Sequence, residues 1–236
     1  MRVIADIHAE PEALREALDG SADRHVVLLG DLVDFGPDPS AVLELALDLV
    51  ESHRATLIRS NHDDRLYRHY LKGRVLVRGT LVQTLAAIAS HPGADHLVDR
   101  FCAAYERAPL WLRLGDHVLA HGAVDPLMAE HPAPACELSK KLRGELMALA
   151  LYGERQPGLG PGELPIRTHG WVDRLPAGLT AIVGHDIRSR EAPLVAEGRA
   201  GGRAIFLDTG SGKGGRLSWI DLPQERITLG ERERQA

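Results

Sequence analysis

The chain has few cysteines, and we expect no leader segment. Cys102 and Cys136 are the two cysteines in 236 residues, and they lack the close spacing of metal ligands and the density of a disulfide framework. The strand expected at Arg2 leaves no room before it for a basic and apolar leader. We therefore expect a cytoplasmic protein in a reducing compartment.

Two further absences concern positive charge and long apolar runs. Lys and Arg number 28 against 33 Asp and Glu, so the formal net charge of −5 offers no general attraction for nucleic acid. A local basic groove remains open. No apolar run reaches the roughly 18 residues expected of a membrane span, so we expect no membrane partner.

Short apolar strands alternate with helices along the chain, which indicates an α/β fold. Pro11 suits a first helical turn, and Asp38 can cap the helix that follows it. We expect helices at 11–18, from 39 to about 53 and from about 137 to 151, with a helical insertion between 63 and about 107. We expect strands at 2–5, 25–29, 55–58, 111–114, 117–120, 179–183, 203–207 and 216–221.

Turn and loop signals complete this outline. Gly115-Asp116 separates two of the strands and indicates a hairpin. The segment 153–165 is dense in Gly and Pro without periodicity, and we expect it to be a mobile loop. The length favours one large domain, which we place at 1–230, followed by a polar tail at 231–236.

Polar side chains gather directly after the expected strands. In an α/β protein, the loops at the carboxyl ends of the strands converge and form the functional site. The six clusters in question are Asp6-Ile7-His8, Gly30-Asp31-Leu32-Val33-Asp34, Ser60-Asn61-His62-Asp63, His121-Gly122, Gly184-His185 and Asp208-Thr209-Gly210.

The first clusters offer carboxylates and an imidazole. Asp6 and His8 are two residues apart, so in an extended segment both side chains point the same way and can reach one ion. Asp31 follows a glycine that permits a sharp turn, and its carboxylate could bridge two ions, while Asp34 could support a neighbouring group. An exposed loop pair and a helix cap are the alternatives for these residues taken alone.

The later clusters add neutral ligands and a proton donor. The amide oxygen of Asn61 is a hard neutral ligand, and the adjacent His62 projects to the other side, where Asp34 could hold it as an imidazolium. His121 and His185 each end an apolar strand and could complete a coordination shell. Single histidines at strand ends are more often structural, but two of them beside four other clusters favour a metal site.

The order Asp-x-His, Gly-Asp-x-x-Asp, Asn-His-Asp, His-Gly and Gly-His, running from Asp6 to His185, resembles the calcineurin-like metallophosphoesterase superfamily. Two later motifs resemble its bacterial and phage phosphoprotein-phosphatase-type branch, namely Leu207-Asp208-Thr209-Gly210 and Gly214-Gly215-Arg216-Leu217. That branch includes symmetrical diadenosine tetraphosphate hydrolases and the phosphatase domain of polynucleotide kinase-phosphatases. The resemblance implies a four-layer αββα sandwich with a helical insertion.

The resemblance also implies a role for each site residue. One divalent ion would be held by Asp6, His8 and Asp31, and a second by Asp31, Asn61, His121 and His185. The two ions would hold a hydroxide that attacks phosphorus in line with the leaving oxygen. His62, held by Asp34, would protonate that oxygen, and Arg59 would grip substrate phosphate. The mixed donors favour Mn²⁺, with Fe, Zn²⁺ or Ni²⁺ as alternatives.

The sequence departs from the family pattern in three places. Phe35-Gly36 replaces the usual Arg-Gly, so one phosphate-binding cation is missing, and Arg188 and Lys213 are candidates to replace it. Phe35 could stack on a flat group or could pack in the interior. Ala9 and Ser60 replace glycines by other small residues, which should preserve the metal geometry.

These features together predict a metal-dependent phosphoesterase that hydrolyses phosphomonoester or pyrophosphate-type bonds. The expected substrates are nucleotides or nucleic-acid ends, and a serine/threonine phosphoprotein phosphatase is the alternative, disfavoured by the missing arginine. A non-catalytic metal-binding scaffold is a third reading, but it would have no reason to keep all six ligands together with His62 and Asp34. The sequence leaves the oligomeric state open.

Overall fold

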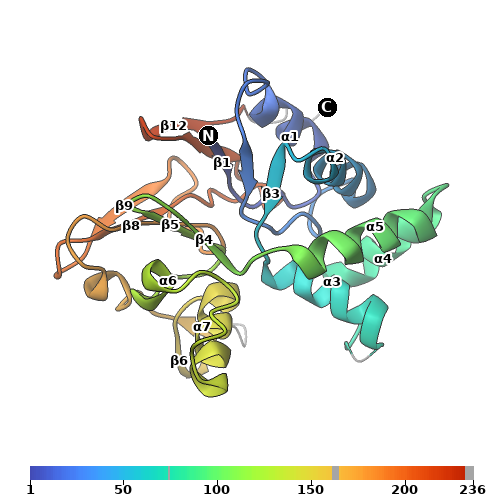
Figure 1. The fold of residues 1–236 in the computed structure, drawn as a ribbon. Coiled ribbons are helices and arrows are strands. Elements are labelled where there is room, and N and C mark those ends of the chain that lie inside the picture. The colour runs from blue at the N-terminus through green and yellow to red at the C-terminus, as the bar shows by residue number, and fades with distance from the viewer. Residues whose placement is uncertain (74, 161–164, 232–236) are drawn as a thin grey trace.

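The computed structural model describes residues 1–73, 75–160 and 165–231, and two five-stranded sheets form its centre (Figure 1). The strands of the first sheet, in spatial order, are β12 (Arg226–Leu229), β11 (Ser218–Asp221), β1 (Arg2–Ile4), β2 (Val26–Leu28) and β3 (Ala55–Leu57). Those of the second are β4 (Trp111–Leu114), β5 (His117–Ala120), β8 (Thr180–Val183), β10 (Arg203–Phe206) and β9 (Leu194–Glu197).

Three neighbouring strands in each sheet run parallel. In the first sheet β1 pairs with β2 and β2 pairs with β3, and in the second β8 pairs with both β5 and β10. The outer pairings, such as β1 with β11 and β10 with β9, are antiparallel. The carboxyl ends of the parallel strands therefore meet along one edge of each sheet, which is where the polar clusters of the sequence lie.

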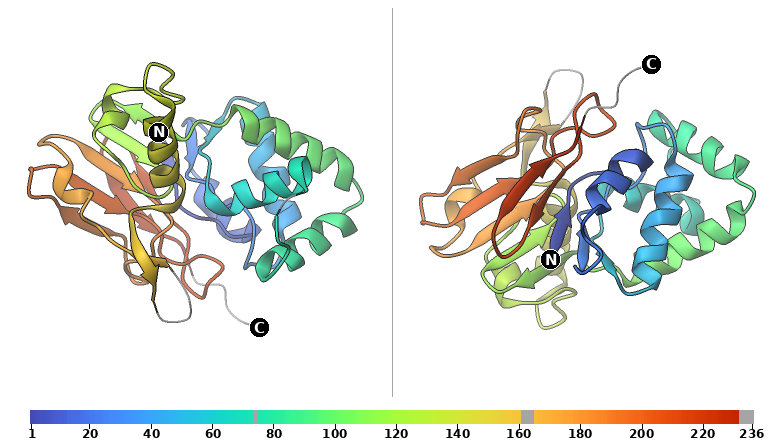
Figure 2. Two further views of the ribbon diagram at one scale, coloured as in Figure 1. Left: turned by 90° about the horizontal axis from the view of Figure 1, so that it is seen from below. Right: turned by 90° about the horizontal axis from the view of Figure 1, so that it is seen from above.

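Helices cover the outer side of each sheet (Figures 1 and 2). The helices α1 (Pro11–Leu18) and α2 (Pro39–Glu51) pack against the first sheet, and α6 (Leu127–Glu130) and α7 (Lys140–Tyr152) pack against the second. The expected αββα layering is confirmed. The helical insertion is confirmed as well, as α3 (Asn61–Lys72), α4 (Thr80–Ser90) and α5 (Ala94–Arg107).

Alternation along the second sheet assigns its side chains to two cores. Leu119, Ile182 and Ile205 join the core that contains the first sheet and its helices. Their neighbours in the strands belong to the core formed with α6 and α7, for example Val118 and Ala181. Because successive strand residues point to opposite faces, this period of two builds a sheet buried on both sides.

The structure confirms two sequence signals that mark the starts of helices. Pro11 is the first residue of α1, and the carboxylate of Asp38 accepts a hydrogen bond from the Ala41 N–H at 2.9 Å. The helix α3 begins two residues before the expected position, because the Ser60 side chain caps it by accepting from the Asp63 N–H. Asn61 and His62 therefore lie in the first turn of a helix.

The prediction of an irregular loop at 153–165 is wrong for its described part. Here β6 (Arg155–Leu159) pairs antiparallel with β7 (Pro165–Arg167), and residues 161–164 lie outside the described ranges. All of β6 is exposed, so neither face needs apolar residues and the sequence shows no alternation. The edge strands β9 and β12 and the short helix α6 were not expected either, and β9 is likewise largely exposed.

Two predictions about the whole chain stay predictions. The extent of a single domain at 1–230 is not tested, and the polar tail lies mostly outside the described ranges, which end at residue 231. Among the described helices, none is long and apolar enough to cross a membrane.

Candidate metal centre

The edge where the two sheets meet brings together all six residues expected to bind metal. Asp6 and His8 follow β1, and Asp31 follows β2. Asn61 opens α3 directly after β3, and from the second sheet His121 follows β5 and His185 follows β8. All of these side chains except that of Asn61 are buried. The centre therefore lies across both sheets.

The backbone at the centre is strained. His8, Asp31 and His185 have φ values of 49°, 49° and 65°, a left-handed region that residues with a Cβ rarely adopt. The chain is therefore not extended at His8, which differs from the expectation, but the ligand atoms of Asp6 and His8 do lie close enough to share one ion.

Asp6, His8 and Asp31 form the first group of donors, with ligand atoms that lie within 4.8 Å of one another. The Nδ1–H of His8 donates to the carbonyl oxygen of Val33 at 3.0 Å, which leaves a lone pair on Nε2. That Nε2 lies 3.4 Å from Oδ2 of Asp31 and is buried without a hydrogen-bond partner. A buried lone pair beside a carboxylate suits a cation.

Asp31, His121 and His185 form the second group, again within 4.8 Å. His121 donates from Nδ1 to the carbonyl oxygen of Leu29 at 2.9 Å, so its Nε2 lone pair points inward. This Nε2 lies 2.8 Å from Oδ1 of Asn61 and 3.4 Å from Oδ1 of Asp31. Three electron-rich atoms converge here, and a shared cation would relieve their repulsion.

Asp31 stands between the two groups, since its Oδ2 faces His8 and its Oδ1 faces His121. The Ser60 hydroxyl oxygen accepts the Asp31 N–H at 2.7 Å, and the His62 N–H donates to Oδ1 of Asp31 at 3.1 Å. These bonds position the carboxylate to bridge two ions.

Glycine is required at Gly30, before this bridging carboxylate. A Cβ at Gly30 would lie 2.4 Å from Cβ of Ser60, so a side chain would displace the residue that holds Asp31.

Burial sets the charge states of the histidines. It lowers the pKa of His8 to about 3, lowers the pKa of His121, and lowers the pKa of His185 well below its usual range. All three imidazoles are therefore neutral near neutral pH and can act as ligands.

The pKa values of Asp6 and Asp31 are shifted in opposite directions. Burial, followed by the charges of Asp208 and Asp31, raises the pKa of Asp6. Burial also raises the pKa of Asp31, but the neighbouring imidazoles of His121, His62 and His8 outweigh it and hold that pKa well below its usual range. Oxygen and imidazole donors without a thiolate suit Mn²⁺, Fe, Ni²⁺ or Zn²⁺.

His62 differs from the other histidines of the site. Its Nδ1 is hydrogen-bonded to Oδ2 of Asp34, and its Nε2 lies 4.0 Å from Oδ2 of Asp31. Burial lowers the pKa of His62, but the charge of Asp31 and the bond and charge of Asp34 outweigh burial, so the pKa is raised. His62 is thus the imidazole of the site suited to carry and donate a proton.

Asp34 is held by residues that the sequence did not indicate. Arg65 donates to its Oδ2 and Thr84 to its Oδ1, each at 2.5 Å. Arg65 follows His62 by one helical turn and could have been found from that spacing. Thr84 lies on α4, 50 positions from Asp34, and no local pattern connects the two.

Asp208 is a further acidic residue at the centre, and no role was predicted for it. It is buried, its Oδ1 accepts the Gly210 N–H at 2.8 Å, and its Oδ2 has no hydrogen-bond partner. Its charge raises the pKa of Asp6 after burial does. The sequence signal that could have indicated a role for Asp208 is its position directly after an apolar strand.

The arginine expected to grip phosphate is engaged elsewhere. Arg59 donates to the carbonyl oxygens of Ala108 at 2.8 Å and Glu106 at 2.7 Å, and its guanidinium lies 5.2 Å from the ring centroid of Tyr105. These contacts fix the end of α5. A role for Arg59 in substrate binding stays a prediction.

The two candidate replacements for the missing arginine lie in different places. Arg188 contacts His169 and lies 3.8 Å from Asp186, the residue after His185. Lys213 places its ammonium 4.6 Å from the ring centroid of Phe35. Phe35 is 43% exposed, so the packed interior position considered for it is not what the structure has.

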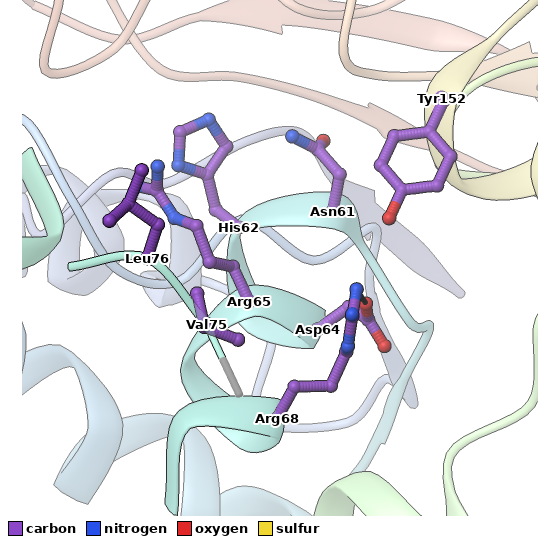
Figure 3. Close-up of a pocket in the computed structure, with 8 residues that line it drawn as sticks. All are labelled: Asn61, His62, Asp64, Arg65, Arg68, Val75, Leu76 and Tyr152. Atoms are coloured by element: carbon purple, nitrogen blue, oxygen red, sulfur yellow. Dashed lines mark ion pairs between the residues drawn. The ribbon is translucent and has the colours of Figure 1, made fainter. Parts of the chain in front are cut away.

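An open cavity of about 330 Å³ lies beside Asn61 and His62 (Figure 3). Arg65 and Arg68 of α3 line one part, and Tyr152 of α7 lines another with its hydroxyl directed toward Arg68. Val75 and Leu76 add an apolar wall. The cavity combines cationic, aromatic and apolar side chains next to the metal centre.

Comparison with known proteins agrees with this geometry. The sequence profile of the family described as calcineurin-like phosphoesterase matches residues 2–135. A bis(5′-nucleosyl)-tetraphosphatase of Bacillus velezensis, named PrpE and specified as asymmetrical, is 30% identical over 94% of this chain and 88% of its own length. The protein of the same name from Geobacillus thermodenitrificans is 29% identical over 94% of this chain and 90% of its own length.

Solved structures show the same fold. One, described provisionally as a diadenosine tetraphosphatase, has a TM-score of 0.62 at 21% identity and covers 97% of this chain and 91% of its own. A protein serine/threonine phosphatase from Saccharomyces cerevisiae has a TM-score of 0.57 at 16% identity and covers 100% of this chain and 80% of its own. Structural likeness alone therefore does not separate the two substrate classes.

Proposed function

Because this chain belongs to the calcineurin-like phosphoesterase family, we propose that it hydrolyses a pyrophosphate-type bond of a dinucleoside polyphosphate, using two divalent ions, preferably Mn²⁺. It is a hydrolase that acts on phosphoric ester bonds. The similarity along 94% of the chain to asymmetrical bis(5′-nucleosyl)-tetraphosphatases carries the choice of substrate. We expect the same asymmetrical cleavage, to a nucleoside triphosphate and a nucleoside monophosphate. A cytoplasmic location is part of this proposal.

The donor set defines where the ions would lie. The first ion would be held by Asp6, His8 and Asp31, and the second by Asp31 with Asn61, His121 and His185. When bound, the ions activate water and withdraw charge from the phosphoryl oxygens. Two observations support this assignment: the unpartnered Nε2 of His8, and the approach of the His121 Nε2 to Oδ1 of Asn61 and to Oδ1 of Asp31.

His62 supplies the proton for the leaving group. A water molecule loses a proton to solvent as its oxygen bonds to phosphorus, the bond from phosphorus to the bridging oxygen breaks, and the electron pair stays on that oxygen, which takes its proton from His62. Asp34 holds Nδ1 of His62, so the proton on Nε2 is the one available for transfer. The raised pKa of His62 keeps that proton in place near neutral pH.

The cavity beside His62 suits a nucleotide leaving group. A proton donor lies on the side from which the leaving group departs, and this cavity borders His62 directly. Arg68 lines it, and the guanidinium of Arg155 lies 4.9 Å from the ring centroid of Tyr152. These cations suit phosphates beyond the one attacked, and the apolar Val75 and Leu76 suit a base or ribose.

The test is hydrolysis of a defined panel with Mn²⁺: diadenosine tetraphosphate, an aryl phosphate, an aryl phosphodiester, a 3′-phosphorylated oligonucleotide and a phosphopeptide. Diadenosine tetraphosphate should be hydrolysed with the highest kcat/KM, to ATP and AMP. In ¹⁸O-labelled water, mass spectrometry of the products would identify the phosphorus that is attacked. Two equivalents of ADP would contradict asymmetrical cleavage.

Matched variants distinguish loss of a site residue from a general effect of substituting a polar side chain. Asn61→Ala should abolish turnover, and His62→Ala should slow hydrolysis of diadenosine tetraphosphate by about 10²- to 10⁴-fold. His96→Ala, at an exposed histidine on α5, should leave turnover unchanged. Preference for the phosphopeptide would indicate the phosphoprotein phosphatase instead. No turnover on any substrate, with metal bound, would indicate the non-catalytic scaffold.

A further inference from the structure

A glycine-rich loop brings a lysine to the mouth of the metal centre. The loop joins β10 to β11 and contains Lys213, one of four lysines in the chain. The ammonium of Lys213 lies 4.6 Å from the ring centroid of Phe35. Phe35 itself occupies the position where the family pattern has arginine.

Phe35 lies close to Lys213, to a candidate metal ligand and to the proposed proton donor. Its ring centroid lies 4.9 Å from that of His8, a metal-ligand candidate, and 5.4 Å from that of His62, the proton donor. A φ of 69° turns Phe35 out of the preceding chain direction. The lysine therefore stands over a ring that borders the reacting position.

Close packing fixes the course of the loop. A Cβ at Gly212 would lie 2.7 Å from Cβ of His8, and one at Gly215 would lie 1.9 Å from the carbonyl oxygen of Thr209. The Ser211 hydroxyl donates to the carbonyl oxygen of Ile7 at 2.9 Å, and Arg190 donates to that of Lys213 at 2.5 Å. The backbone at Lys213 is thus held against the residues that carry the metal donors.

Three arginines near the centre are already engaged. Arg65 donates to Asp34, and Arg188 contacts His169 and Asp186. Arg59 is tied to backbone carbonyls at the end of α5. The Lys213 ammonium instead lies against the face of the Phe35 ring. An aromatic face orients a cation without cancelling its charge, as a carboxylate would do.

We infer that Lys213, supported on the ring of Phe35, binds a non-bridging phosphate oxygen of the substrate and replaces the arginine that this chain lacks after Asp34. The ligand class is a phosphate group of a nucleotide or of inorganic phosphate. This inference rests on the proposed function for its substrate, but its binding chemistry requires only phosphate.

The first test is direct binding of inorganic phosphate to the Mn²⁺-loaded full chain by calorimetry. Lys213→Met should weaken phosphate binding about 10- to 100-fold, as expected for a lost charge-assisted hydrogen bond, and Lys213→Arg should retain most of it. Lys141→Met, an exposed lysine on α7, is the matched control and should bind phosphate like the wild type. Unchanged phosphate affinity in Lys213→Met would overturn the inference.

The second test restores phosphate binding by placing a cation at position 35 instead of position 213. In the Lys213→Met background, Phe35→Arg places a cation where the family pattern has one and should restore phosphate affinity at least in part. Metal content should stay the same in all of these variants, and a loss of Mn²⁺ with Lys213→Met would show instead that the loop supports the metal centre.

Kinetics then separate this inference from the proposed function. With diadenosine tetraphosphate, Lys213→Met should lower kcat/KM by a factor similar to the loss in phosphate affinity. If the wild type does not hydrolyse that substrate, the proposed function fails, and the phosphate-binding result still decides the role of Lys213.

Discussion

The Nε2 atom of His121 lies 2.8 Å from Oδ1 of Asn61, although His121 follows a strand of the second sheet and Asn61 follows a strand of the first. The same Nε2 lone pair lies 3.4 Å from Oδ1 of Asp31, because Nδ1 of His121 carries the proton that is donated to the carbonyl oxygen of Leu29. The centre therefore forms only when the two sheets are packed together, and a bound ion should in turn hold them together.

Asn61→Ala should lower the metal content without unfolding the protein. The substitution removes one neutral ligand from the second ion, while Asp6, His8 and Asp31 still hold the first. We expect bound Mn²⁺ to fall from about two to about one per chain, measured by elemental analysis after dialysis, with turnover lost. Two ions retained in Asn61→Ala would show that Asn61 is not a ligand.

His62→Gln should lower kcat while the metal content stays unchanged. Loss of a general acid slows a reaction by about 10²- to 10⁴-fold, and the loss should be smallest for aryl phosphates, whose leaving groups need little protonation. An equal loss on good and poor leaving groups would argue against proton donation by His62.

The pH dependence of kcat should depend on Asp34, the hydrogen-bond partner of His62. Activity requires the protonated imidazole, and its pKa is raised, so the rate should fall as pH rises through that value. Asp34→Asn removes one of the two carboxylates that raise the pKa, and the alkaline limb of the kcat profile should move to lower pH. His62→Gln should lack this limb altogether, and an unmoved limb in Asp34→Asn would contradict the assignment.

Gly184→Ala should damage the centre through one methyl group. A Cβ at Gly184 would lie 2.0 Å from Oδ1 of Asp6, which currently accepts the His185 N–H at 3.1 Å. We expect loss of metal and turnover, together with a lower Tm. Gly144→Ala is the control, because a Cβ on that residue of α7 meets nothing within 4 Å and should stabilise the helix by about 0.5–1 kcal/mol.

Chelation should destabilise the protein more strongly as pH rises. The raised pKa of Asp6 means that its contribution to metal-free stability is complete below the ordinary value of 3.8 and is lost as pH rises through the folded-state pKa. Mn²⁺ replaces that proton. His8 adds nothing to this difference above about pH 4, because its pKa of about 3 already leaves it neutral.

The measurement is Tm with Mn²⁺ and with chelator between pH 5 and pH 8. The gap between the two should widen until Asp6 is fully ionised, and Mn²⁺ at 100 times its Kd should add about 2.7 kcal/mol to the free energy of unfolding. A gap that narrows as pH rises would contradict the raised pKa of Asp6.

The sequence predicted elements where the signal is local. Pro11 and Asp38 marked helix starts correctly, because capping depends on residues one to three positions away. The exposed strands β6 and β9 carry no apolar alternation, so they could not be found in this way. Thr84 escaped prediction because its contact with Asp34 depends on how α4 packs.

By itself the sequence determined the types of donor, their order and their places after strands, including Asn61, the one asparagine of the chain. Only the tertiary structure decided which oxygen of Asp31 faces which histidine, and that Arg59 is tied to carbonyls while Lys213 stands over Phe35. These relationships join residues far apart in sequence. They depend on the packing of two sheets, and no short-range pattern encodes the burial and side-chain directions that result.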